Sequence, residues 1–234
     1  PPARVCAVLG MHRSGTSVMA RALQVLGVEL GDQLMPPSKG DNEKGFWEDE
    51  DITRFDDALL ETLGSSYDRL ALLDEKGQCH ELTAERKTAV SLLAAKIEPV
   101  ELFGFKDPRT AILLPFWQTV FQELALDERY VIAIRNPLSV ANSLLKRNNI
   151  PLERGILLWA KHMSGVIRHT QDKQRVVVDY DLMLESPSHQ IERIADALSL
   201  PLDKHSRQRL DLYQNEFISR GLRHHSVSLE ELER

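Results

Sequence analysis

A glycine-bearing loop near the amino terminus carries residue types suited to binding an anion. The segment Gly10–Ser17 (GMHRSGTS) combines two glycines, three hydroxyl side chains and an arginine. It follows the apolar run Arg4–Leu9 and precedes a helical pattern over Ser17–Leu26. Glycines allow a tight turn, and the N–H groups of such a turn and of a helix N-terminus attract phosphate-like groups. The residues expected to bind the anion are His12, Arg13, Ser14, Gly15, Thr16 and Ser17.

This loop differs from the nucleotide-triphosphatase P-loop at one decisive position. Gly10 and Gly15 keep the P-loop spacing, but Thr16 stands where the lysine belongs. Because that lysine neutralises the β- and γ-phosphates, its replacement weakens a kinase or NTPase interpretation. Arg13 is the obvious substitute cation, and the loop suits a small anionic group better than a triphosphate with its metal.

Three later segments place polar residues where predicted strands end. Phe105–Arg109 (FKDPR) follows one strand pattern, and Arg135–Pro137 (RNP) follows the next, with Ser143 eight residues after Arg135. Asp179–Asp181 closes the last strand pattern. In open α/β sheets, ligands bind beyond the carboxyl ends of the strands. All three segments can therefore converge with the loop on one ligand.

The elements that position these segments alternate between strands and helices. The predicted strands are Arg4–Leu9, Leu102–Lys106, Tyr130–Ile134 and Val176–Asp179. The predicted helices are Ser17–Leu26, Ile52–Leu63, Ala84–Ile97, Leu113–Leu124, Leu138–Arg147, Arg154–Gln171 and His189–Ala197. This alternation predicts an α/β fold with a mostly parallel central sheet flanked by helices. The segment 32–45, rich in Pro, Gly and charge, is predicted to be a long functional loop.

Length and charge narrow the functional classes. The 234 residues fit a single domain spanning residues 1–234. The net charge of −6 argues against general binding to nucleic acid or to an acidic membrane. No run approaches the ~20 apolar residues of a membrane span. The two cysteines are far apart, which indicates neither a disulfide framework nor a zinc site.

Together these segments resemble the PAPS-dependent sulfotransferase superfamily, where PAPS is 3′-phosphoadenosine 5′-phosphosulfate. The loop resembles the 5′-phosphosulfate loop, in the R-S-G-T-[ST] form of tyrosylprotein and some bacterial carbohydrate sulfotransferases. The pair Arg135 and Ser143 resembles the 3′-phosphate motif, whose arginine and serine are also eight residues apart. Lys106–Pro108 resembles the K-D-P of the tyrosylprotein enzymes. Val178–Asp181, with Glu185–Pro187, resembles the segment after the last core strand.

The resemblance covers about residues 5–190 and implies a sulfotransferase fold with a role for each segment. Arg13 and the N–H groups of Ser14–Ser17 would hold the 5′-phosphosulfate. Arg135 and Ser143 would hold the 3′-phosphate, the arginine by a charge-assisted contact. Lys106 would stabilise the charge that develops on the bridging oxygen of the leaving group.

The acceptor hydroxyl needs a general base, and three carboxylates are candidates. Cytosolic small-molecule sulfotransferases place a histidine two residues after the lysine, where this chain has Pro108. Glycosaminoglycan and tyrosylprotein enzymes use a glutamate downstream of the loop, and Glu43 and Glu48 match that type at a longer spacing. Glu48 is favoured because Phe46–Trp47 can form an apolar wall that raises its pKa. Asp107 is the third candidate, and the alternative for Glu48 is a surface position in an acidic run.

Further residues are expected at the edges of the donor site. Tyr180 is expected to line the donor pocket. Arg220 and Arg223 belong to a basic segment that either closes over the 3′-phosphate or forms a solvated tail. No zinc-ligand spacing appears, so the expected ligands are PAPS as co-substrate and its product adenosine 3′,5′-bisphosphate (PAP), with no metal.

The sequence therefore predicts a sulfotransferase that acts on a hydroxyl, with a saccharide as the first acceptor class and a small molecule or peptide tyrosine next. The alternatives are a nucleotide kinase or NTPase with a degenerate P-loop, and a non-catalytic nucleotide-binding module of the same fold. No nucleic-acid partner or membrane segment is expected in this chain. We expect a bacterial cytoplasmic protein, with a trimmed lumenal domain as the alternative, because the chain begins at Pro1 rather than Met.

Overall fold

The computed structural model describes residues 2–38, 45–74 and 81–218, and it centres on a sheet of four parallel strands. The strands lie in the order β2-β1-β3-β4, so the first strand in the chain is internal. Their bounds are β1 (Arg4–Leu9), β2 (Leu102–Lys106), β3 (Asp127–Ile134) and β4 (Gln174–Asp179). The α/β class with a parallel sheet, predicted from the alternation of strands and helices, is confirmed.

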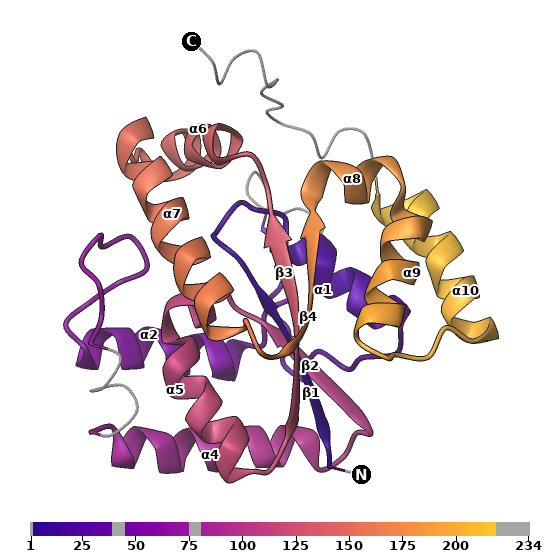
Figure 1. Ribbon diagram of the computed structural model, residues 1–234, viewed down its shortest axis with the longest axis horizontal. Coiled ribbons are helices and arrows are strands. Elements are labelled where there is room, and N and C mark those ends of the chain that lie inside the picture. Colours follow the sequence, from indigo (N-terminus) through magenta and orange to yellow (C-terminus); the bar gives the residue numbers. More distant parts are fainter. Residues whose placement is uncertain (1, 39–44, 75–80, 219–234) are drawn as a thin grey trace.

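Helices cover both faces of the sheet (Figure 1). On one face lie α2 (Glu50–Thr62), α4 (Thr83–Ile97), α5 (Thr110–Glu123) and α7 (Leu152–His169). On the other lie α1 (Thr16–Val25), α9 (Pro187–Ala197) and α10 (Lys204–Leu212), the last followed by the π-helical turn η1 (Tyr213–Phe217). The remaining helices, α6 (Pro137–Asn148) and α8 (Tyr180–Glu185), begin directly beyond the ends of β3 and β4.

Alternation along β1 divides the core into two apolar clusters. Val5, Ala7 and Leu9 pack with the large aromatic side chains of β2 and α5. Cys6 and Val8 point to the opposite face and pack with α1, α9 and α10. Successive strand side chains point to opposite faces, so a strand buried on both faces is a continuous apolar run.

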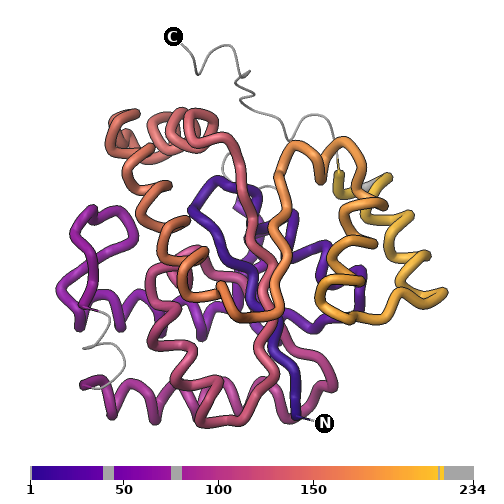
Figure 2. Tube along the Cα trace, in the orientation of Figure 1, coloured from indigo at the N-terminus to yellow at the C-terminus, as the bar shows by residue number. Residues whose placement is uncertain are grey.

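The carboxyl ends of all four strands meet at one edge of the sheet. The register pairs Val8 with Lys106, Leu9 with Ile132, and Ile134 with Asp179. Figure 2 shows the chain leaving β3 and β4 at the same end of the sheet. The loop after β1 and the turns after β2, β3 and β4 are therefore neighbours, as expected for the predicted site.

Several elements differ from the sequence predictions. β3 and β4 begin earlier than predicted, at the polar residues Asp127 and Gln174. β4 ends at Asp179 as predicted, and Tyr180 begins α8, because the Asp179 side chain caps that helix by accepting from the N–H groups of Asp181 and Leu182. Helix α10 and the turn η1 were not predicted. None of the described helices has the length and apolar character needed to span a membrane.

Candidate functional site

The loop between β1 and α1 has the backbone of a tight strand-to-helix turn. Gly10 lies against β3, where an added Cβ would come within 2.8 Å of the Ala133 carbonyl oxygen. Gly15 has a φ of 86° and precedes α1 without a side-chain cap. No acidic residue lies in the first turn of α1. A helix N-terminus of this kind favours an anion because its first N–H groups have no partner within the helix.

The N–H groups of the loop are not all directed outward. The N–H of Ser14 donates to the Met11 carbonyl at 3.1 Å, and the Ser14 side chain is buried. The Ser17 hydroxyl donates to the Phe46 carbonyl at 3.1 Å. These two groups thus have partners within the protein, and their expected contact with the anion stays a prediction.

Two arginines and a serine from three elements converge beside the loop. Arg13, in the left-handed region with a φ of 69°, donates from Nε to the Ser143 hydroxyl at 2.8 Å. Arg135, at the end of β3, donates from Nη1 to the Arg13 carbonyl at 3.2 Å. Arg135 and Ser143 are both buried. The structure thus joins Arg13, expected at the 5′-phosphosulfate, to the pair expected at the 3′-phosphate.

Local structure explains how Arg135 and Ser143 reach this position. Asn136 caps α6 by accepting from the N–H groups of Leu138 and Ser139, and Pro137 begins the helix. An Asn cap followed by Pro at the first helical position is a strong helix start. The helix therefore begins immediately after Arg135 and carries Ser143 back toward the loop.

The Tyr180 ring lies between the loop and Arg135. The Arg135 guanidinium carbon is 4.5 Å from the ring centroid, a cation–π contact. A Cβ added to Gly15 would come within 2.2 Å of Tyr180 Cδ2, so only glycine fits beside the ring. Tyr180, expected to line the donor pocket, is buried and contacts residues of both predicted phosphate sites.

Lys106 and Glu48 form a buried ion pair at the end of β2. Lys106 Nζ contacts Glu48 Oε1, and both side chains are buried. The immediate partner of Glu48 is therefore an ammonium group rather than the apolar wall predicted from Phe46–Trp47. The Trp47 ring lies elsewhere, 5.0 Å from the Arg21 guanidinium carbon and 6.1 Å from the Phe217 ring.

Asp107, the other described base candidate, is held in a different set of contacts. Its Oδ1 accepts from the backbone N–H and from Nη1 of Arg109, each at 2.9 Å. Burial raises the pKa of Asp107 to about 6, opposed by the positive charge of Arg109. Arg109 in turn donates from Nε to Asp57 at 2.5 Å. Asp107 is thus tied to the start of α5 and is fully buried.

His12 faces a segment that the sequence analysis did not include. Its ring centroid lies 4.4 Å from that of Tyr67, in the chain that follows α2. Its Nε2 is buried and has no hydrogen-bond partner among the described residues. Burial, reinforced by the positive charge of Arg109, lowers the pKa of His12 well below its usual value, so the ring is neutral.

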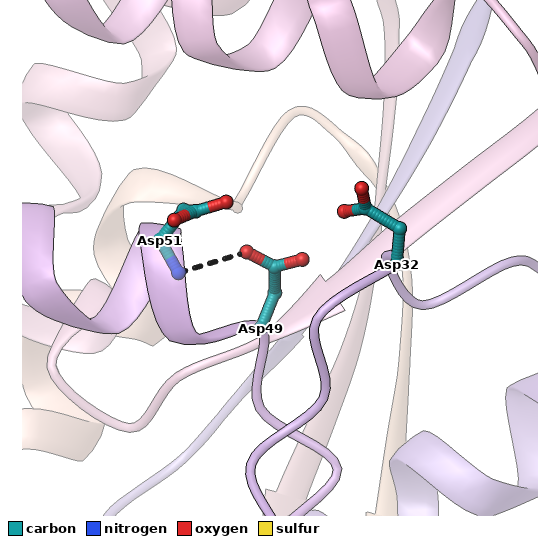
Figure 3. Close-up of side chains that lie close together, drawn as sticks. All are labelled: Asp32, Asp49 and Asp51. Carbon is teal, nitrogen blue, oxygen red and sulfur yellow. Dashed lines mark hydrogen bonds between the residues drawn. The ribbon is translucent and has the colours of Figure 1, made fainter.

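Three carboxylates near the end of the long loop form a cluster that can be compared with a metal site. Asp32, Asp49 and Asp51 point toward one another (Figure 3), and each offers an oxygen within 4.8 Å of the others. The Lys96 ammonium contacts the three at 2.8, 2.8 and 3.0 Å. Burial acts to lower the pKa of Lys96, but the hydrogen bonds to the three carboxylates raise it overall. The Lys96 ammonium thus neutralises part of the negative charge of this cluster.

The predicted site residues differ in how far the structure describes them. The described site residues lie at the carboxyl edge of the sheet: the loop residues, Glu48, Lys106, Asp107, Arg135, Ser143 and Tyr180. Glu43, Arg220 and Arg223 lie outside the described residues. The sequence analysis did not identify Asp56, Tyr67 or Arg109 as site residues. Of these three, only Arg109 could have been found from the sequence, because it stands in the same segment after the strand as Lys106.

The fold is that of sulfotransferases. The sulfotransferase domain of the Synechococcus PCC 7002 olefin synthase superposes with a TM-score of 0.59 at 16% identity, over 99% of this chain and 93% of that domain. A sulfotransferase from Mycobacterium avium gives a TM-score of 0.58 at 14% identity, over 100% and 75% of the two chains. The sulfotransferase domain of the curacin biosynthetic pathway gives 0.51 at 16% identity, over 89% and 78%. No protein-family model and no curated protein matches the chain.

Proposed function

We propose that this chain is a sulfotransferase that moves a sulfuryl group from PAPS to a hydroxyl group and releases PAP. The observation that carries the proposal is the convergence of Arg13, Arg135 and Ser143 beside the N-terminus of α1. PAPS carries anionic groups at both ends of its nucleoside, and a loop with a second cationic point suits such a donor. The sulfotransferase fold supports the same assignment.

Donor binding is assigned to the loop and to the α6 start. The uncapped first turn of α1 and the loop would hold the 5′-phosphosulfate, and Arg135 with Ser143 would hold the 3′-phosphate. Arg13 contacts Ser143 and its carbonyl is held by Arg135, so we place it between the two ends of the donor. A planar guanidinium can contact two oxygens at once, which suits this bridging position.

The transfer step is assigned to the Lys106–Glu48 pair. The acceptor oxygen forms a bond to sulfur while the bond from sulfur to the bridging oxygen breaks. Lys106 stabilises the negative charge that the bridging oxygen gains, and Glu48 takes the proton of the acceptor hydroxyl. The direct contact between their side chains supports this pairing, because both groups must lie close to the transferred group. Asp107 has its own set of partners and is the weaker base candidate.

The acceptor class is proposed from the form of the loop alone. The R-S-G-T sequence, with serine after the threonine, resembles that of some bacterial carbohydrate enzymes and of the tyrosylprotein enzymes, so we propose a saccharide hydroxyl as the first acceptor class and a small molecule or peptide tyrosine as the next. Transfer of ³⁵S from labelled PAPS to a panel of saccharides, phenols and tyrosine peptides tests this assignment. Labelling confined to the phenols or the peptides would contradict the saccharide assignment but not the sulfotransferase one.

Ligand-induced thermal stabilisation separates this function from a kinase or NTPase. A ligand at 100 times its dissociation constant stabilises a protein by about 2.7 kcal/mol. We expect PAP at millimolar concentration to raise the melting temperature without Mg²⁺, and ATP–Mg²⁺ to raise it less. Stabilisation by ATP–Mg²⁺ with no effect of PAP would support the degenerate P-loop instead.

A further inference from the structure

Two fully buried carboxyl groups face each other behind the end of β2. Asp56 belongs to α2, and Asp107 follows Lys106 directly. Asp56 accepts from Trp117 Nε1 at 2.8 Å through one oxygen and from the Thr110 hydroxyl at 3.0 Å through the other. The two carboxyl groups lie within hydrogen-bonding reach of each other.

The contacts of Asp107 leave one of its oxygens in need of a donor. Both hydrogen bonds from Arg109 go to Oδ1. Oδ2 is buried and receives no N–H or O–H from a described residue. Buried acceptors in proteins nearly always have a donor, and two adjacent buried carboxylates cannot both be ionised cheaply. A proton carried by one carboxyl group supplies the missing donor and removes the repulsion.

We propose that Asp56 and Asp107 share one proton and together act as a positioning pair for Lys106 and Glu48. Glu48 lies just before α2, which carries Asp56, and Lys106 lies just before Asp107. Two contacts thus join the end of β2 to α2 and the residues before it. Lys106 contacts Glu48, just before α2, and Asp107 contacts Asp56, in the middle of α2. If both carboxyl groups were ionised, their repulsion would push α2 away from β2 and separate the ion pair.

The charges around the pair are consistent with a single shared proton. Burial raises the pKa of Asp56 well above its usual value, and the charge of Asp107 raises it further. Burial also raises the pKa of Asp107. The positive charge of Arg109, which also contacts Asp57, opposes this rise, and the negative charge of Glu48 adds to it. Lys106 is engaged with Glu48. One proton on the pair leaves a single negative charge opposite Arg109.

Carbon-13 NMR of the aspartate carboxyl groups tests the sharing directly and needs no activity. In the wild-type protein we expect the pair to titrate in two steps, one near pH 6, the value to which burial raises the pKa of Asp107, and one at higher pH, because burial and the charge of Asp107 raise the pKa of Asp56. In Asp56→Asn the amide donates to Asp107 but carries no titrating proton, so the step at higher pH should disappear. If every aspartate of the wild-type protein titrates below about pH 5, or if Asp56→Asn keeps the step at higher pH, the sharing is disproved.

Stability against pH gives a second readout of the shared proton. The folded state holds a proton that the unfolded chain releases near pH 4, so wild-type stability falls as the pH rises from there to the raised pKa of the pair. Asp56→Asn keeps the hydrogen bond without that proton. Its melting temperature relative to wild type should therefore increase between about pH 4 and pH 7. A constant difference across this range would contradict the proposal.

The positioning role rests on the proposed function, and its readout is turnover. Asp56→Ala removes the donor to Asp107 Oδ2, and we expect kcat to fall about 10-fold or more with the KM for PAPS unchanged. Asp56→Asn should restore most of kcat. Equal kcat in wild type and Asp56→Ala would overturn the positioning role. If the wild-type protein transfers no sulfuryl group while the NMR result holds, the proposed function fails and the shared proton stands.

Discussion

The cations at the carboxyl edge of the sheet are held in two different ways. Lys106 is matched by the carboxylate of Glu48, so its charge is balanced inside the protein. Arg13 donates to the Ser143 hydroxyl, and Arg135 contacts the Arg13 carbonyl and the Tyr180 ring. Burial lowers the pKa of Arg135, although nearby acidic residues oppose the shift. A buried guanidinium beside the start of α1 is well placed to bind an anionic ligand by a charge-assisted contact.

Replacing Arg135 should weaken donor binding. A hydrogen bond to a charged group contributes about 1.5–3 kcal/mol, so we expect Arg135→Ala to raise the dissociation constant of PAP about 10- to 100-fold. Isothermal titration calorimetry measures this change. Arg86→Ala, an arginine of α4 paired with Glu123, is the control and should leave PAP binding unchanged. Equal affinities in the two variants would remove Arg135 from the binding site.

Replacing Glu48 should affect turnover rather than donor binding. A general base contributes about 100-fold or more to a rate, so Glu48→Gln should lower kcat by about that factor while PAP affinity stays within about 2-fold of wild type. The neighbouring Glu50→Gln changes charge by the same amount at the first residue of α2 and is the control. Normal kcat in Glu48→Gln would eliminate Glu48 as the base.

At the scale of single elements, the start of α1 depends on a glycine with two separate constraints. Gly15 has a positive φ, and its missing side chain makes room for the Tyr180 ring. Gly64 has a φ of 61° with open space around it. An alanine at Gly64 would therefore meet only the cost of the left-handed backbone, whereas an alanine at Gly15 would also clash with Tyr180.

We expect Gly15→Ala to lower stability by more than Gly64→Ala and to abolish PAP binding. The left-handed conformation costs an alanine about 1–2 kcal/mol at either position, and only Gly15→Ala adds a clash with Tyr180. Chemical denaturation and calorimetric titration of both variants measure the two effects. Equal losses of stability with PAP binding intact in both would show that the contact between Gly15 and Tyr180 has no role in the donor site.

The sequence predicts some elements residue for residue and misses others for identifiable reasons. β1 and β2 are short apolar runs with sharp limits, so Arg4–Leu9 and Leu102–Lys106 match their predictions. β3 and β4 begin with polar residues that break the apolar pattern, so the sequence does not show where these strands begin to pair. Helix α8 spans six residues, too few for a helical period to be visible.

The site was predictable only where its residues belong to local motifs. Short sequence motifs after the predicted strands identify the loop, Lys106, Arg135 and Ser143. The pairing of Asp56 with Asp107 and Trp117 joins residues some 50 or 60 positions apart, and nothing in either local pattern indicates it. Contacts of this kind depend on how α2 packs against β2 and α5, which periodicity does not specify.

At the scale of the whole molecule, buried histidines make stability sensitive to acid. His162 in α7 donates from Nδ1 to the Leu158 carbonyl at 2.8 Å, and its buried Nε2 has no partner among the described residues. Burial lowers the pKa of His162 to about 4. The unfolded chain therefore takes up a proton at a higher pH than the folded protein, and stability falls as the pH drops from about 6.5 toward 4.

Substituting this histidine should reduce the acid sensitivity. In His162→Asn the amide can still donate to Leu158 but does not titrate. We expect the variant to be less stable at pH 7 and to lose less stability than wild type between pH 7 and about pH 4.5, as urea denaturation measures. Comparing the two proteins cancels contributions from other groups, including the Asp56–Asp107 pair. Parallel losses would show that the pKa of His162 is the same in the folded and the unfolded protein.

We propose that the protein binds its nucleotide through two separate anionic groups, and the most direct test compares two ligands that differ in one of them. Calorimetric titration with PAP and with adenosine 5′-monophosphate isolates the 3′-phosphate. We expect PAP to bind about 10-fold or more tightly than the monophosphate, because Arg135 and Ser143 add a charge-assisted contact. The difference should disappear in Arg135→Ala. Equal affinity of the wild-type protein for the two nucleotides would contradict the account.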